Sequence, residues 1–200
     1  MVEQPKRPRF QFCFSTWFLL VAILAACLFG ALYLRGLLYY DSESFVGDGS
    51  LSDGGFWSYP RYRIEFPAIS LSDSNVTQFC FSGPPTTRTT FKLAMTSAEG
   101  WTGWNFGEQL RSDVRLRGIS VDVVLVDSQG RAIMQYGGPL QQWMLMQSDA
   151  EGAFWHVSGR NVPLNKREAY TLTVRTTASA GNTLQLTAKP LLYGGGNEGL

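Results

Sequence analysis

The chain has 200 residues, of which 44% are apolar, 14% aromatic and only 16% charged, with 17 Lys and Arg against 16 Asp and Glu. The charged share is well below the roughly 25% of an average soluble protein, and the aromatic content excludes a disordered chain or a coiled coil. A net charge of +1 gives no basic excess to neutralise phosphates, so we expect no nucleic-acid partner.

Only Cys80 of the three Cys lies outside the apolar N-terminal segment, so the Cys residues and the single His do not predict a zinc site, and an odd number of Cys excludes a complete disulfide framework. The sequence therefore predicts neither a metal nor a cofactor.

The N-terminal segment carries the strongest signal. No charge occurs over residues 10–34, and residues 17–34 are almost entirely apolar. A helix rises about 1.5 Å per residue, so a run of this length can cross a hydrocarbon core of roughly 30 Å. We predict a transmembrane signal-anchor helix over residues 10–38, preceded by a cytoplasmic tail over residues 1–9.

The charges that flank this segment predict its orientation. Lys6, Arg7 and Arg9 precede it, whereas Arg35 is the single basic residue close to its other end. Because cytoplasmic ends retain Lys and Arg, the N-terminus is expected in the cytoplasm. The rest of the chain is then expected on the periplasmic or extracellular side of the inner (plasma) membrane, held by a single span.

The sequence Leu24-Ala25-Ala26-Cys27 resembles the lipobox of bacterial lipoproteins. This resemblance implies cleavage before Cys27 and lipidation of that residue. The alternative is an uncleaved anchor, because residues 28–34 stay apolar where lipoproteins usually become polar. Both interpretations tether the protein to a membrane.

The remainder of the chain is divided by composition. Residues 39–60 are rich in Gly, Ser and Asp and are predicted to form a stalk. Residues 61–193 are predicted to form an exported β-domain, and residues 194–200 a flexible tail.

Strand patterns recur through the β-domain. Polar and apolar residues alternate over residues 61–66, 77–82 and 90–96, and the last of these places Phe91, Leu93 and Met95 on one face. Further strands are expected over residues 140–147 and 153–158.

Two hairpins are predicted. Residues 119–126 and 131–136 flank a turn at residues 127–130, and residues 170–177 and 183–188 flank a turn at residues 179–182. About nine short strands, with helical signal only around residues 105–114, predict an antiparallel β-sandwich of immunoglobulin-like or jelly-roll type. The fold class is all-β, preceded by the N-terminal helix.

Few residues suggest catalysis. His156 is the only histidine and lies in a predicted strand, and no Gly-x-Ser-x-Gly nucleophile elbow occurs. Cys80 has no partner in its own domain and is expected to be a small buried residue, with an intermolecular disulfide as the alternative. Trp143 and Trp155 are expected in the core. We therefore assign no catalytic residues.

A Trp-containing loop is the one candidate ligand site. Residues 100–105 place Trp101 and Trp104 beside Asn105 in a Gly-rich segment. Flat indole rings stack on sugar rings, while polar side chains bond to the hydroxyls, so this loop is a candidate carbohydrate platform. The competing interpretation is that the two Trp close one end of the sandwich.

Three functional hypotheses remain, in order of preference. The first is a single-pass, membrane-anchored, non-enzymatic module that contacts a protein partner in the envelope or serves as an accessory subunit of a membrane complex. The second is a membrane-tethered carbohydrate-binding module using the Trp loop. The third is a hydrolase whose site leaves no sequence motif.

Overall fold

A computed structural model describes residues 14–39, 44–53, 62–97, 109–110, 112–149, 152–156 and 161–194. The chain divides into two compact units, Met1–Tyr39 and Tyr40–Leu200. Each unit is described by itself.

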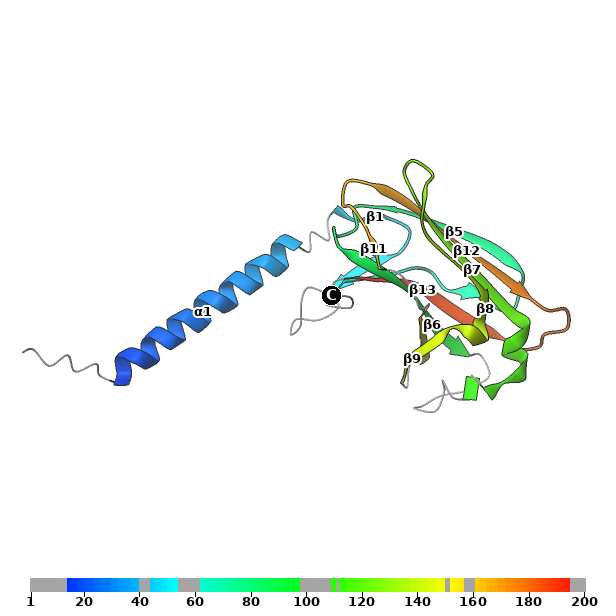
Figure 1. The fold of residues 1–200 in the computed structure, drawn as a ribbon, viewed down its shortest axis with the longest axis horizontal. Helices are drawn as coiled ribbons and strands as arrows, with labels where there is room; N and C mark the ends of the chain where they lie inside the picture. The colour runs from blue at the N-terminus through cyan, green and yellow to red at the C-terminus, as the bar shows by residue number, and fades with distance from the viewer. Residues whose placement is uncertain are drawn as a thin grey trace, which may run out of the picture. The chain divides into compact units, whose positions relative to one another are not determined.

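The first unit contains one long helix, α1 (Phe14–Tyr39), drawn in blue in Figure 1. Over residues 17–31 its apolar side chains lie on every side instead of forming one stripe. Many are well exposed: Phe18 is 70% exposed, Leu24 65% and Leu28 66%. The prediction of a helix in this region is confirmed. The predicted span over residues 10–38 is not, because no helix in the described part of the chain is long and apolar enough to cross a membrane.

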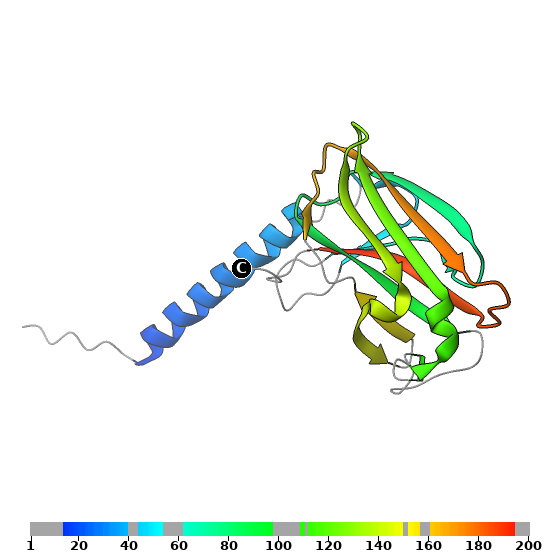
Figure 2. The ribbon, with the colours of Figure 1, turned by 45° about the vertical axis from the view of Figure 1, so that its right-hand side comes forward.

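The second unit is a sandwich of two antiparallel sheets (Figures 1 and 2), which confirms the predicted fold class at this level. The first sheet, sheet A, has the order β1 (Val46–Gly47), β5 (Asn75–Ser82), β12 (Ala169–Ala178), β7 (Ile119–Asp127) and β8 (Ala132–Pro139).

The second sheet, sheet B, has eight strands. Its main path runs through β2 (Ser50–Asp53), β3 (Tyr62–Glu65), β13 (Leu186–Gly194), β6 (Arg88–Ser97), β10 (Gly152–His156) and β9 (Met144–Asp149). In addition, β4 (Ile69–Ser70) pairs with β13, and β11 (Val162–Pro163) pairs with β6.

The core follows from strict alternation along the strands, since successive side chains of a strand point to opposite faces. In β7 every second residue from Ile119 to Leu125 is fully buried, and in β6 the predicted face of Phe91, Leu93 and Met95 is buried. Trp143 is also buried and meets the Phe91 ring edge-on, with centroids 6.2 Å apart. Its predicted place in the core is confirmed.

The predicted hairpin over residues 119–136 is confirmed by the pairing of β7 with β8. The predicted strand over residues 140–147 is only partly right, because it begins with a short 3-10 turn, η3 (Leu140–Gln142), before β9. Residues 109, 110 and 112 are helical, and the 3-10 helix η2 (Val114–Gly118) follows, so helical structure does occur where the sequence predicted it.

The predicted C-terminal hairpin is wrong, because β12 and β13 belong to different sheets. Their apolar residues face the same core from its two sides. The connection between them is held by other segments: the Ser179 amide donates to the Gly118 carbonyl (2.8 Å), and the Asn182 side-chain amide donates to the Arg115 carbonyl (2.9 Å). These bonds fix the connection as a loop that crosses from sheet A to sheet B, and not as the turn of a hairpin.

The predicted stalk over residues 39–60 is wrong for its described part beyond Ser44, because β1 and β2 lie there. β1 pairs with β5 and β2 with β3, while Phe45 and Leu51 pack against the core. A Cβ on Gly47, where φ is +131°, would collide with the backbone of β5, so glycine is required for this approach. Gly47 therefore allows tight packing against β5.

Candidate binding site

The residues of the predicted carbohydrate loop, Trp101, Trp104 and Asn105, lie outside the described residues. Cys27 lies on α1 and is exposed, and nothing in the structure tests its lipidation. His156 ends β10 and is in register with Lys92 of β6. Among the described residues, no three His, Cys, Asp or Glu side chains are grouped so that they could hold a metal ion.

Cys80 is not buried, contrary to expectation. Its neighbours Phe79 and Phe81 point into the core, so the alternation of β5 turns Cys80 outward. Its amide donates to Asp48 Oδ2 (2.7 Å), and its Sγ lies 3.8 Å from Thr171 Oγ1. The free thiol is exposed on the outer face of sheet A.

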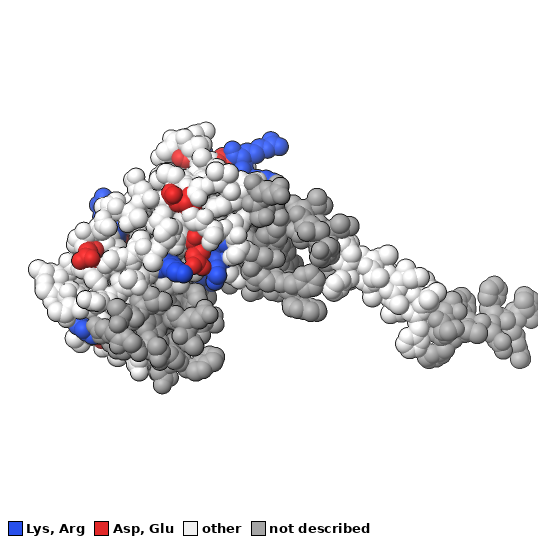
Figure 3. Space-filling view, turned by 180° about the vertical axis from the view of Figure 1, so that it is seen from behind, with Lys and Arg blue, Asp and Glu red and all other residues white. Residues whose placement is uncertain are grey.

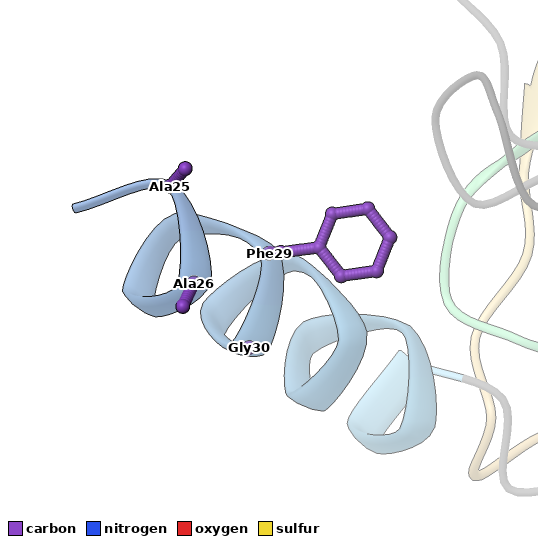
Figure 4. Close-up of a pocket in the computed structure, with 4 residues that line it drawn as sticks. All are labelled: Ala25, Ala26, Phe29 and Gly30. Carbon is purple, nitrogen blue, oxygen red and sulfur yellow. The ribbon is translucent and has the colours of Figure 1, made fainter. Parts of the chain in front are cut away.

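One hollow lies on the surface of α1, where Ala25, Ala26 and Gly30 leave space beside Phe29 (Figure 4). Figure 4 shows the Phe29 ring standing out from the helix, while the two alanines add only short methyl groups. The hollow has a volume of about 530 Å³ and is lined almost wholly by apolar atoms. It contains no group that could orient a polar ligand.

A second concavity lies on the outer face of sheet A, over the strands β12, β7 and β8, coloured orange, green and yellow-green in Figure 2. Its volume is about 670 Å³. The residues that line it combine charged, polar and apolar groups: Asp122, Val124, Gln135, Tyr136, Gly137, Thr173 and Arg175. We refer to this feature as the sheet A concavity.

Strand register brings these residues together in two rows. Arg175 of β12 is paired with Asp122 of β7, which is paired in turn with Gly137 of β8. In the second row, two residues further along each strand on the same outer face, Thr173 is paired with Val124, and Val124 with Gln135. Side chains directly opposite each other on neighbouring strands have Cβ atoms about 4.5–5.5 Å apart, so each row is a compact set.

Gly137 creates room beside Asp122. A Cβ at position 137 would collide with the carboxylate of Asp122, so the absence of a side chain lets that carboxylate lie over β8. The side chains of Asp122 and Arg175 form no ion pair or hydrogen bond with any residue that the structure describes. Their polar atoms are therefore available to a ligand.

Charges elsewhere on the sandwich serve local structure. Figure 3 shows Lys and Arg interspersed with Asp and Glu on the face drawn there, without a continuous area of one sign. On β3 and β13, Glu65 pairs with Arg63 (3.2 Å) and Lys189 (2.7 Å). Hydrogen bonds from Arg115 hold the pKa of Asp113, which caps η2, below its ordinary value.

Tyr170 is a buried titratable group that does structural work. Its hydroxyl accepts a hydrogen bond from the Asn165 amide (2.7 Å) and donates to Glu168 (3.2 Å). Burial raises the pKa of Tyr170 above its ordinary value. The residue therefore stays protonated at neutral pH and holds the turn before β12 in place.

The sequence contained part of the signal for the sheet A concavity. The predicted hairpin over residues 119–136 already places Asp122 and Val124 on one face of β7, opposite β8. Thr173 and Arg175 could not be added, because their strand pairs with β7 across about fifty residues of sequence.

No protein-family model matches the chain, and no curated protein matches it. Among solved structures it is similar to a protein from Sulfurospirillum deleyianum, with a TM-score of 0.42 and 9% identity over 64% of this chain and 95% of that one. It is also similar to an insecticidal delta-endotoxin from Bacillus thuringiensis (TM-score 0.35, 13% identity, 65% of this chain and 20% of that one).

A third similar structure is the CBM36-1 domain of a multidomain xylanase from the hindgut metagenome of Trinervitermes trinervoides. Its TM-score is 0.30, with 14% identity over 78% of this chain and 98% of that one.

Proposed function

We propose that the protein is a membrane-attached, non-enzymatic binding module that acts in the cell envelope or as an accessory subunit of a membrane complex. One observation carries the proposal: α1 exposes apolar side chains on all its sides, while the β-sandwich closes a core of its own. A helix that is apolar all round is stable where apolar material covers it, and lipid chains provide such a cover.

The flanking charges give the proposed arrangement. Lys6, Arg7 and Arg9 hold the N-terminus in the cytoplasm, and the sandwich lies on the periplasmic or extracellular side of the inner (plasma) membrane. The sharpest form of the proposal is a single-pass anchor over residues 10–38, a range that extends beyond the described part of the chain in which no span was found. The partner is then a protein or polymer of the envelope that contacts the exposed sheet faces.

The attachment is tested by extracting native membranes first with high salt and then with alkaline carbonate. We expect the protein to resist both treatments, because apolar contacts with lipid are insensitive to salt and pH. A Leu24→Arg/Leu28→Arg double variant should shift to the soluble fraction, whereas Val76→Arg, at an exposed position on the sandwich, should not. Release of the wild-type chain by salt alone would contradict attachment through α1.

The orientation is tested with the exposed thiol of Cys80. A membrane-impermeant maleimide added to spheroplasts or intact cells should label wild-type protein and label Cys80→Ser much more weakly. Labelling that requires lysis would place the sandwich in the cytoplasm and overturn the orientation.

The second candidate function is a membrane-tethered carbohydrate-binding module. The observation in its favour is the sheet A concavity, where an amide, a hydroxyl, a carboxylate and a guanidinium surround an aliphatic floor. The Trp loop remains a separate proposed platform: Trp101→Ala combined with Trp104→Ala should abolish glycan retention, and Asn105→Ala should weaken it. Unchanged retention by the double variant would exclude the loop.

A further inference from the structure

The geometry points to the sheet A concavity as a binding site for an uncharged, hydroxyl-rich ligand, an oligosaccharide segment. This inference deepens the second candidate function by naming a site outside the Trp loop, and it rests on the sandwich being a binding domain, not on membrane attachment.

The charge arrangement favours an uncharged ligand. Asp122 and Arg175 occupy one register position on neighbouring strands, so their opposite charges compensate each other. An anionic ligand attracted to Arg175 would be repelled by Asp122, and a cationic ligand attracted to Asp122 would be repelled by Arg175. A hydroxyl group can contact either residue without such opposition.

The hydrogen-bonding groups suit neighbouring hydroxyls. A carboxylate only accepts, a guanidinium only donates, and the Gln135 amide and Thr173 hydroxyl do both. Each sugar hydroxyl is itself a donor and an acceptor, so adjacent hydroxyls can bond to Asp122 and Arg175 together. Neither side chain forms an ion pair with the described residues, so both can form hydrogen bonds with sugar hydroxyls.

The floor of the concavity suits the carbon face of a sugar ring. Val124 lies between Thr173 and Gln135 in the central row and presents an aliphatic surface. Gly137 keeps the neighbouring position open. The volume of about 670 Å³ lies within the roughly 300–1,000 Å³ typical of small-ligand sites.

The test uses the full-length protein in lauryldimethylamine oxide micelles, a detergent without a sugar headgroup. The probes are maltohexaose, cellohexaose and N-acetylchitotetraose, with a heparin-derived hexasaccharide as the charged control, and binding is measured by titration calorimetry. We expect at least one neutral probe to bind and heparin hexasaccharide not to bind. Absence of binding by all three neutral probes at millimolar concentration, or binding of heparin alone, would overturn the proposal.

Three variants assign the binding to this site. Asp122→Asn and Gln135→Ala should each weaken it by about tenfold, since each removes a hydrogen bond to the ligand. Gly137→Ala should weaken it similarly by displacing the Asp122 side chain, and should leave the fold intact because a flexible side chain gives way. Gln129→Ala, at an exposed position in the turn between β7 and β8, removes the same type of side chain as Gln135→Ala and is the control that should bind as wild type.

The outcomes separate this proposal from the others. Loss of binding in the Trp101→Ala/Trp104→Ala variant, with Asp122→Asn unaffected, would place the glycan at the Trp loop and overturn the sheet A site. Membrane pelleting of every variant is measured in parallel, so failure of membrane attachment is recognised independently of sugar binding.

Discussion

Asp127 organises the turn between β7 and β8. Its Oδ1 accepts hydrogen bonds from the amides of Gln129 and Arg131, both at 2.9 Å, and its Oδ2 accepts from Arg131 Nε at 2.8 Å. Gly130 adopts φ +75°, a conformation that glycine takes without strain. These bonds to the charged carboxylate hold the pKa of Asp127 below its ordinary value, with the Arg131 amide as the largest cause.

Asp127→Asn should lower the stability of the sandwich at neutral pH. A carboxyl group whose pKa is depressed by folding contributes stability above its unfolded pKa, about 3.8, and loses that contribution as pH falls through the folded value. Urea unfolding of both proteins, followed by tryptophan fluorescence across a pH series, should therefore give curves that differ at pH 7 and converge in acid. Asp122→Asn, on the same strand, is the control, and a pH-independent gap would refute the argument.

Single side chains were predictable where strand alternation alone decides their burial. Phe91, Leu93 and Met95 follow that rule and are buried as predicted. Cys80 follows the same rule, but its residue type suggested the core, and the alternation set by Phe79 and Phe81 overrides that preference. Local pattern is the stronger predictor of burial here than the chemistry of an isolated thiol.

At the scale of elements, the segment from Ser44 to Asp53 belongs to the sandwich. Asp48 bonds to β5 at two points, through its amide to the Cys80 carbonyl and through its carboxylate to the Cys80 amide. Phe45 packs with its ring centroid 6.1 Å from that of Phe81. A segment with these contacts contributes to folding.

Phe45→Ala should destabilise the sandwich by about 1–2 kcal/mol, the amount expected for a half-buried aromatic ring. Val46→Ala, one residue further and 65% exposed, should change the free energy of unfolding very little. Equal stability of the two variants in chemical denaturation would mean that the segment behaves as a free linker after all.

The C-terminal strand shows why some elements could not be delimited from sequence. β13 continues through Pro190 to Gly194, although proline normally interrupts a central strand. The Pro190 carbonyl accepts from the Phe66 amide (3.0 Å), so the missing N–H points to the interruption between β3 and β4 and not to β6. Whether β13 can contain Pro190 depends on which strands lie beside it, and the local sequence does not reveal those strands.

At the scale of the whole molecule, the sequence predicts the sandwich class correctly because alternation and turn residues recur along the chain. It does not predict which strands meet. The sheet A concavity draws on three strands, and only the β7–β8 hairpin is local. A site of this kind becomes visible only once long-range pairing is known.

Both sheets have one of the last two strands in their interior. β12 lies between β5 and β7, and β13 lies between β3 and β6. A chain ending at residue 168 should therefore show no cooperative unfolding transition, whereas one ending at residue 194 should unfold as wild type. A stable core in the shorter chain, measured by pulse proteolysis, would contradict this dependence.

This placement has a consequence for biosynthesis. During translation, strands β1 to β11 emerge before the two strands that complete the sheets, so neither sheet can close until β12 and β13 have been made. The apolar segment of α1 emerges before any strand of the sandwich. A polypeptide that folds this late can still pass through a translocation channel in an unfolded state. Chaperones that bind unfolded chains can also bind it until β12 and β13 have been made.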